Sequence, residues 1–229
     1  MAGHPADHPG PLAFVADLHM PELDDDDLHH LQRVLRLRPG APLTVGDGLG
    51  RWRPAQLTDA RVEPTGPIEE LASPEPRLSV GFALVKGDKP ELVVQKLTEL
   101  GIDRIVPFRA ARSVVRWDDA KAAKAVARLR VVARAAAMQS HRPHLPGIAD
   151  VTDLRDLVAE DGVAMADRQG AAIGPAHATV LVGPEGGWSD EERAISVPRV
   201  ALGVHVLRAE TAAITAGVLL CIRRGCGDR

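Results

Sequence analysis

The chain contains 229 residues, of which 45% are hydrophobic and 26% are charged, a composition that excludes intrinsic disorder and supplies one large core or two modest ones. No apolar stretch reaches the roughly 18 to 20 residues that a membrane span needs, and the first twenty residues lack a secretory signal pattern, so we expect a cytoplasmic protein without a membrane partner. The net charge of −3 is unevenly distributed: residues 1–72 carry six Arg and twelve Asp or Glu, whereas residues 86–142 carry thirteen Lys or Arg against six acids.

Residues 12–71 are rich in Pro and Gly and contain the short apolar stretches 42–45 and 51–57, which are separated by the turn Gly46-Asp47-Gly48. Apolar stretches on either side of such a turn are typical of a β-hairpin. A helix is expected over residues 24–35, where four consecutive aspartates suit the positive end of the helix dipole. The sequence therefore predicts a small β-barrel with one helix.

The segment Ser73-Pro74-Glu75-Pro76 predicts a linker, because the residue before each Pro is pushed out of helical geometry. The chain before it and the chain after it differ in composition and in charge. We therefore expect two domains, residues 1–72 and residues 73–229.

The second region opens with a predicted strand, helix and strand. Residues 78–85 form a continuous apolar stretch, and the helix that follows is expected to begin with Asp88 and Glu91 as a capping pair and to stop at Gly101. Residues 102–107 then predict a second strand. Two strands joined by a helix of about three turns require a parallel sheet.

The remaining chain continues this alternation, so we assign an α/β fold. A long alanine-rich helix is expected over 118–139, a further helix from 189 and a closing helix over 210–223, with short strands at 162–166, 179–182 and 200–202.

The first candidate site is the loop Gly183-Pro184-Glu185-Gly186-Gly187, which follows a buried strand and precedes a helix capped by Ser189 and Glu192. Glycines allow main-chain groups to approach a ligand that side chains would hold away. The loop has neither the Gly-Lys-Ser/Thr of a phosphate loop nor the spacing of a dinucleotide fingerprint. An ordinary tight turn is the alternative.

The second candidate is the loop around Gly203, after which Glu210 and Thr211 open the final helix. Both loops follow the carboxyl ends of predicted parallel strands, the edge where open α/β sheets bind ligands. The alternative is that these two polar side chains only cap the helix.

Two basic clusters, at residues 109–116 and 139–143, are candidates for phosphate contact, because the planar guanidinium group donates two parallel hydrogen bonds. The chain has no Tyr and only three Phe and three Trp, which argues against an aromatic platform for stacked bases. Ordinary surface charge is the alternative. The two cysteines, Cys221 and Cys226, match neither a redox pair nor a zinc site, and we expect no metal.

Taken together, these segments resemble the bacterial small-subunit ribosomal RNA uridine N3-methyltransferases, knotted enzymes of the SPOUT class. The resemblance covers nearly the whole chain. The segments that carry it are His30 to Gly40, Gly46-Asp47-Gly48, Lys86, Glu91, Gln95-Lys96, Glu99-Leu100-Gly101, Arg112-Ser113, Gln139, Arg142, Pro146, Gly183 to Gly187, and Leu207-Arg208-Ala209-Glu210-Thr211-Ala212.

The resemblance implies a PUA-like RNA-binding barrel followed by a SPOUT parallel sheet with a C-terminal trefoil knot. It implies S-adenosylmethionine as cofactor, 16S ribosomal RNA of the small ribosomal subunit as partner, and a homodimer. The implied cofactor site comprises Leu181, Gly183, Pro184, Glu185, Gly186, Gly187, Leu202, Gly203, Val204, Leu207 and Thr211. The implied RNA contacts are Arg33, Arg36, Arg112, Arg116 and Arg142.

Methylation of uridine at N3 requires a weakly acidic ring N–H to lose its proton before the ring anion attacks a methyl group. We assign Arg208 to stabilise that anion. The candidates for the base on the two loops are Glu185, His205 and Glu210, and we rank Glu210 first because the resembling signature carries it.

The chain departs from the family at Val204-His205, where Pro-Arg is usual, and the change removes a permanent charge. Two other functions stay open: a non-catalytic RNA-binding or ribosome assembly factor, and an α/β enzyme that acts on a small nucleotide.

Overall fold

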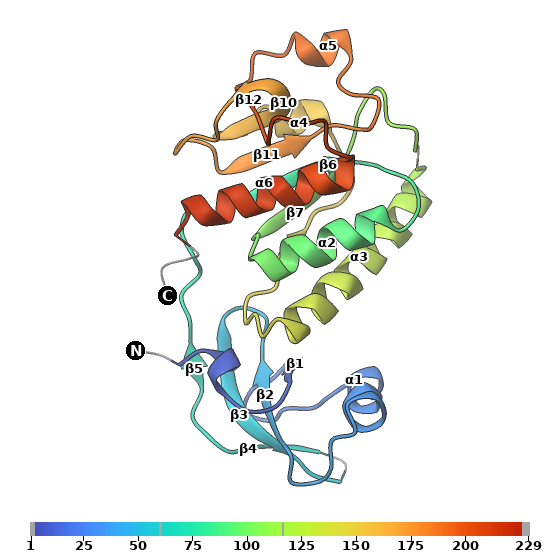
Figure 1. The fold of residues 1–229 in the computed structure, drawn as a ribbon. Coiled ribbons are helices and arrows are strands. Elements are labelled where there is room, and N and C mark those ends of the chain that lie inside the picture. Colours follow the sequence, from blue (N-terminus) through green and yellow to red (C-terminus); the bar gives the residue numbers. More distant parts are fainter. Residues whose placement is uncertain (1–2, 60, 116, 226–229) are drawn as a thin grey trace. The chain divides into compact units, whose positions relative to one another are not determined.

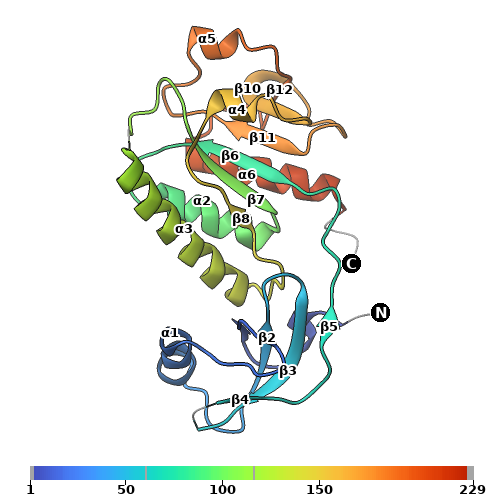
Figure 2. The same ribbon diagram turned by 180° about the vertical axis from the view of Figure 1, so that it is seen from behind.

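A computed structural model describes residues 3–59, 61–115 and 117–225. The chain forms two compact units (Figures 1 and 2). The first comprises the residues up to Ser73 together with Arg134–Leu145, and the second comprises Pro74–Ala133 and the residues from Pro146 onward.

The first unit is built on a five-stranded sheet in which β1 (Leu12–Phe14), β2 (Pro42–Gly46), β3 (Arg51–Leu57) and β4 (Val62–Pro64) follow one another, with β5 (Glu69–Glu70) also paired to β3. Strands β2 and β3 pair antiparallel across the Gly-Asp-Gly turn, so the predicted hairpin is confirmed. Strand β1 pairs parallel to β2.

The predicted helix of this unit is also confirmed, with one irregularity. Helix α1 (Asp25–His29) starts at Asp24, whose carboxylate accepts from the Asp27 amide at 2.7 Å, and it continues as a π-helical turn, η2 (His30–Val34). A short 3-10 turn, η1 (Pro5–Asp7), precedes β1.

Its core joins the sheet to the last part of a helix that begins in the other unit. Leu31, Leu43 and Val45 are buried at its centre, and Ala137 of α3 (Asp119–Gln139) packs with Leu12 and Phe14. On the same helix Arg134 donates to both oxygens of the buried Asp27 carboxylate, at 2.8 and 2.5 Å.

The second unit contains a seven-stranded sheet in the order β12-β10-β11-β6-β7-β8, with β9 also paired to β7. All of its pairings are parallel, as predicted. Its strands are β6 (Ser79–Ala83), β7 (Arg104–Arg109), β8 (Gly147–Ile148), β9 (Thr152–Asp153), β10 (Val163–Ala171), β11 (Thr179–Val182) and β12 (Arg199–Val200). The trefoil knot stays a prediction.

Both faces of this sheet are covered, because successive strand residues point to opposite sides. Val180 and Val182 of β11 lie in the core with residues of α2 (Lys89–Leu100) and α6 (Ala209–Arg223), whereas Leu181 lies in the core on the other face with Phe108 and Trp188. Two one-turn helices complete the unit, α4 (Leu154–Leu157) and α5 (Asp190–Arg193).

The start of α2 corrects one prediction. Asp88 occupies the N-cap position, but its side chain makes no capping hydrogen bond, because its backbone has ψ near 5° and not the extended conformation of a capping residue. Glu91 instead pairs with Arg128, at 2.9 Å. The helix does stop at Gly101, which adopts the left-handed conformation with φ of 94°.

Across the described parts of the chain, no helix combines the length and the apolarity needed to cross a membrane.

Candidate active site

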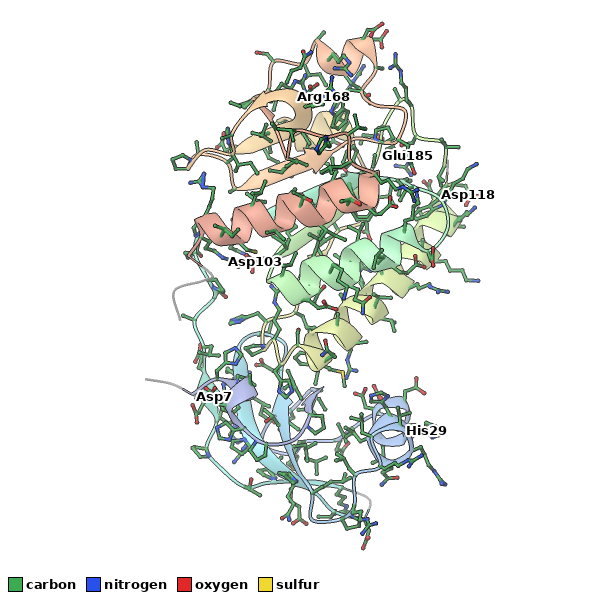
Figure 3. The ribbon with its side chains drawn as sticks, viewed as in Figure 1. Asp7, His29, Asp103, Asp118, Arg168 and Glu185 are labelled. Carbon is green, nitrogen blue, oxygen red and sulfur yellow. The ribbon has the colours of Figure 1, made fainter. Side chains whose placement is uncertain are left out.

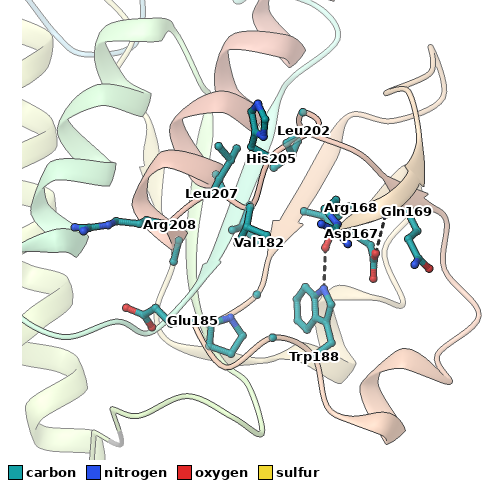
Figure 4. Close-up of a pocket in the computed structure, with 18 of the residues that line it drawn as sticks. Asp167, Arg168, Gln169, Val182, Glu185, Trp188, Leu202, His205, Leu207 and Arg208 are labelled. Atoms are coloured by element: carbon teal, nitrogen blue, oxygen red, sulfur yellow. Dashed lines mark hydrogen bonds between the residues drawn. The ribbon is translucent and has the colours of Figure 1, made fainter.

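The loops that follow β11 and β12 line the same cavity, which has a volume of about 620 Å³ (Figure 4). It lies at the carboxyl ends of the parallel strands β10, β11 and β12, the edge where α/β sheets bind ligands. Both glycine-containing loops therefore lie at the ligand edge of the sheet, as predicted, and they line one cavity. Its lining residues are Ala166, Asp167, Arg168, Gln169, Val182, Gly183, Pro184, Glu185, Gly187, Trp188, Arg193, Leu202, Gly203, His205, Val206, Leu207, Arg208, Ala209 and Ala212.

The loop after β11 is held firmly by the Trp188 side chain. The Trp188 ring stacks on Phe108 with centroids 6.1 Å apart, and its Nε1 donates to the Ala166 carbonyl at 2.8 Å. Glycine at position 183 suits this packing, since a Cβ there would meet three indole atoms at 3.0 to 3.2 Å and the ring would have to shift.

The same loop is closed by a capping box, as predicted. Ser189 Oγ accepts from the Glu192 amide at 3.2 Å, and the Glu192 carboxylate accepts from the Ser189 amide at 2.8 Å. The other Glu192 oxygen accepts from the Ala111 amide, also at 2.8 Å. The loop thus has a defined shape before any ligand enters.

The loop after β12 has fewer internal contacts than the loop after β11. The Ala201 amide donates to the Ala171 carbonyl, but among the described residues the main-chain amides of 202–207 make no hydrogen bond to another main-chain group. Val204 and Val206 are 83% and 82% exposed. Within the described parts of the chain, this loop therefore presents main-chain donors that have no main-chain partner beside the cavity.

One end of the pocket is charged. Lys89 Nζ lies 3.0 Å from Glu185 Oε1 and 3.4 Å from Glu210 Oε2. Burial raises the pKa of Glu185, but hydrogen bonds from its own amide and from Lys89, with the charges of Lys89 and Lys86, outweigh burial and hold that pKa below its usual value. The hydrogen bond to Glu185 raises the pKa of Lys89, against desolvation and with help from Glu210.

The opposite end of the pocket holds Asp167 and Gln169, well separated from Glu185 and Arg208 (Figure 4). Asp167 accepts from Arg193 Nη1 and from the Gln169 amide, both at 3.0 Å. Sequence reasoning missed this side, because it ended the strand at residue 166. The signal was present: an apolar run gives way to Asp-Arg-Gln, the polar residues expected at the ligand edge of a parallel strand. Figure 3 shows Arg168 and Glu185 on separate segments of this unit.

Eight of the residues that the sequence assigned to cofactor or catalysis line the cavity: Gly183, Pro184, Glu185, Gly187, Leu202, Gly203, Leu207 and Arg208. Five others lie elsewhere. Leu181 is buried in the core on the other sheet face, and Gly186 faces Arg112, to which a Cβ would come within 3.2 Å. Val204 and Thr211 are exposed to solvent. Glu210 lies next to the cavity with its carboxylate directed to Lys89.

The arginines assigned to RNA divide between the two units. Arg33 and Arg36 are exposed in the first unit, to which the half-buried Arg142 also belongs. Arg112 is exposed in the second unit, 3.9 Å from Asp190. Arg116 lies outside the described residues.

Comparison with known proteins identifies the family. Residues 73–220 match the model of the RNA methyltransferase domain, and residues 23–63 match that of the RNA methyltransferase PUA domain. The Ribosomal RNA small subunit methyltransferase E of Mycobacterium bovis is 33% identical, over 85% of this chain and 83% of that protein. The protein of that name from Bacillus subtilis is 31% identical, over 83% and 85%.

Solved structures agree. The Ribosomal RNA small subunit methyltransferase E from Neisseria gonorrhoeae, bound to S-adenosyl methionine, has a TM-score of 0.78 and 25% identity, and covers 92% of this chain and 96% of its own. A putative methyltransferase from Legionella pneumophila in complex with the same cofactor has a TM-score of 0.81 and 26% identity, over 93% and 97%. The chain therefore belongs to the RNA methyltransferase family, with the PUA and methyltransferase domains that define it.

Proposed function

We propose that this protein is an S-adenosylmethionine-dependent methyltransferase that modifies N3 of a uridine in 16S ribosomal RNA. The observation that carries the proposal is the cavity that both predicted loops form at the ligand edge of the sheet. The relatives named for methylation of small-subunit ribosomal RNA, at 31% and 33% identity over most of the chain, support the substrate class.

The cavity residues fit this cofactor. Its volume lies within the range of roughly 300 to 1,000 Å³ typical of small-molecule sites, and Val182, Leu202 and Leu207 supply apolar walls. The main-chain amides of residues 202–207, which have no main-chain partner in the part of the chain that the structure describes, supply hydrogen-bond donors for a heterocycle. When bound, the cofactor supplies an electrophilic methyl group on a positively charged sulfur, and the Glu185 carboxylate in the lining is a suitable counter-charge.

The charged end of the pocket provides the groups that the uridine chemistry needs. Arg208 is exposed at the cavity and can stabilise the negative charge that develops on a uracil ring as N3 loses its proton. Glu210, two residues along, is the base in this proposal. A positioned base contributes about 10²- to 10⁴-fold to a rate.

The N3 atom lies on the Watson–Crick edge of uridine, so the target base must be unpaired or flipped out of its helix when it reacts. We propose that Arg33, Arg36, Arg112, Arg116 and Arg142 bind the phosphates around it. Two other arginines of the first unit make contacts of their own, since Arg51 pairs with Asp47 and Arg53 donates to the carbonyls of Gly66 and Leu18.

A homodimer is part of the proposal, since a two-fold axis lets the RNA-binding unit of one subunit serve the catalytic pocket of the other. Sedimentation of the purified protein tests this. A concentration-independent monomer that methylates RNA at full rate would exclude it.

The function is tested by mass spectrometry of 16S ribosomal RNA from cells with and without the gene. We expect one N3-methyluridine to disappear on deletion and to return with the wild-type gene. A gene carrying Glu210→Gln or Arg208→Ala should restore it about 100-fold more slowly, if at all. An unchanged modification pattern in the deletion strain would refute the proposed function.

A further inference from the structure

Lys89 joins three segments that are far apart in the sequence. It is the first residue of α2, while Glu185 lies in the loop after β11 and Glu210 in the first turn of α6. Its Nζ approaches one carboxylate oxygen of each, at 3.0 and 3.4 Å. One ammonium group therefore connects the wall of the pocket to the helix that carries the proposed base.

The local structure of α2 does not account for a lysine at this position. A cation at the first residue of a helix faces the positive end of the helix dipole, which disfavours it. The neighbouring acids do not compensate, since Asp88 makes no capping hydrogen bond and Glu91 pairs with Arg128. Residues that break local rules in this way are expected at functional sites.

The Glu210 carboxylate is largely buried, and the hydrogen-bonding capacity of one of its oxygens is not satisfied among the described residues. Its side chain is only 13% exposed, and its Oε2 atom, although buried, makes no hydrogen bond among the described residues. The contact with Lys89 at 3.4 Å is an ion pair and not a well-formed hydrogen bond. This oxygen therefore keeps the capacity to accept a proton or a hydrogen bond from another molecule.

Lys89 is the cation that pairs with both carboxylates, Glu185 and Glu210. Two further positive charges belong to this region: Lys86 acts on Glu185, and Arg208, next to the start of α6, lines the pocket. Without Lys89, two negative groups would face each other with one of them largely buried, an arrangement that is costly.

We propose that Lys89 is a positioning residue, which gathers the carboxylates of Glu185 and Glu210 and thereby holds Glu210 beside the pocket for proton abstraction. This inference rests on the proposed function, because it assumes that Glu210 is the base. It adds a residue to the site that neither the glycine-containing loops nor the basic clusters include.

The test is single-turnover methylation of 16S ribosomal RNA across a pH series, with wild-type protein and the variants Lys89→Met and Lys89→Arg. We expect Lys89→Met to lower the single-turnover rate at saturating enzyme and cofactor by about 10- to 100-fold, with little change in the enzyme concentration that gives half of the maximal rate. The acid limb of its pH profile should move to higher pH, because Glu185 has lost the cation whose hydrogen bond and charge lower the pKa of its carboxyl group. Lys89→Arg should restore most of the rate and the position of the limb.

Lys124→Met is the matched control, since it removes an exposed lysine of α3 in the same unit and should leave the rate at saturation unchanged. A purely structural role for Lys89 would lower the rate equally at every pH. Should Lys89→Met lose its fold, Lys89→Gln, which keeps a polar end group, is measured in its place.

Hydrogen exchange of the free protein provides a readout that needs neither cofactor nor RNA. Exchange in the peptide spanning 183–189 should rise at least several-fold in Lys89→Met and remain near wild type in Lys89→Arg. If wild-type protein does not methylate RNA, the proposed function fails. Hydrogen exchange still shows in that case whether Lys89 holds the loop that carries Glu185. If wild type methylates and Lys89→Met matches it in rate, pH profile and exchange, the role of Lys89 is refuted.

Discussion

The two loops of the pocket are built in opposite ways. The loop after β11 is held by the stacked Trp188 ring, by the hydrogen bond from that ring to Ala166, and by the Ser189–Glu192 capping box. The loop after β12 has exposed valines, and its amides over 202–207 have no main-chain partner among the described residues. The loop after β11 is therefore a packed wall of the pocket, and the loop after β12 has main-chain groups that can bond to a ligand. A site that binds and then releases a cofactor can use a fixed wall and an exposed loop together.

The largest loss of stability should come from Gly183→Val in the loop after β11. A Cβ already meets the indole at 3.0 to 3.2 Å, so the branched side chain must displace Trp188. We expect a loss of about 3 kcal/mol in the free energy of unfolding, measured by urea denaturation, and loss of cofactor binding by calorimetry. Stability within about 0.5 kcal/mol of wild type would show that the packing of this loop is not tight.

Trp188→Phe should have a smaller effect. Phenylalanine keeps an aromatic ring against Phe108 but removes the donor to Ala166, leaving a carbonyl without its partner. We expect about 1 to 2 kcal/mol of destabilisation, and weaker cofactor binding because Ala166 lines the cavity. Trp52→Phe in the first unit is the control for tryptophan loss, and it should not alter cofactor affinity. Equal affinities for wild type and Trp188→Phe would contradict the role given to this bond.

Glu185→Gln tests the electrostatic part of the loop after β11. Because the pKa of Glu185 lies below its usual value of 4.5 in the folded protein, its contribution to stability is complete above that pH and is lost as the pH falls through the folded value. We expect wild type to be slightly more stable than Glu185→Gln at neutral pH and the difference to vanish in acid. Unfolding curves across the pH range measure it, and a difference that grows on acidification would contradict the lowered pKa of Glu185.

The smallest change in the free energy of unfolding is expected for substitutions in the loop after β12. Val204→Ser and Val206→Ser alter side chains that are more than four-fifths exposed, so the free energy of unfolding should change by less than about 0.5 kcal/mol. Thermal unfolding of each variant and of wild type at the same protein concentration is the measurement. A loss of several degrees would mean that this loop is packed, and the contrast between the loops would no longer hold.

The sequence predicted this contrast only in part. Gly183 and Gly203 were recognised because glycines after buried strands are a local signal, and Ser189 with Glu192 specified the helix start through their three-residue spacing. The pattern could not show that Trp188 lies over Gly183, since that contact depends on how the loop folds back. It also did not reveal that β10 extends to Ala171 and brings Asp167 and Gln169 to the pocket.

By itself the sequence determined the parallel sheet, the hairpin of the first unit and the two loops at the ligand edge, because the alternation of apolar residues, glycines and caps acts over a few neighbouring residues. Tertiary structure alone decided that Lys89 meets Glu185 and Glu210, and that Asp27 pairs with Arg134. Lys89 and Glu185 are 96 positions apart, and a contact over that separation is set by the packing of whole elements, to which no local pattern responds.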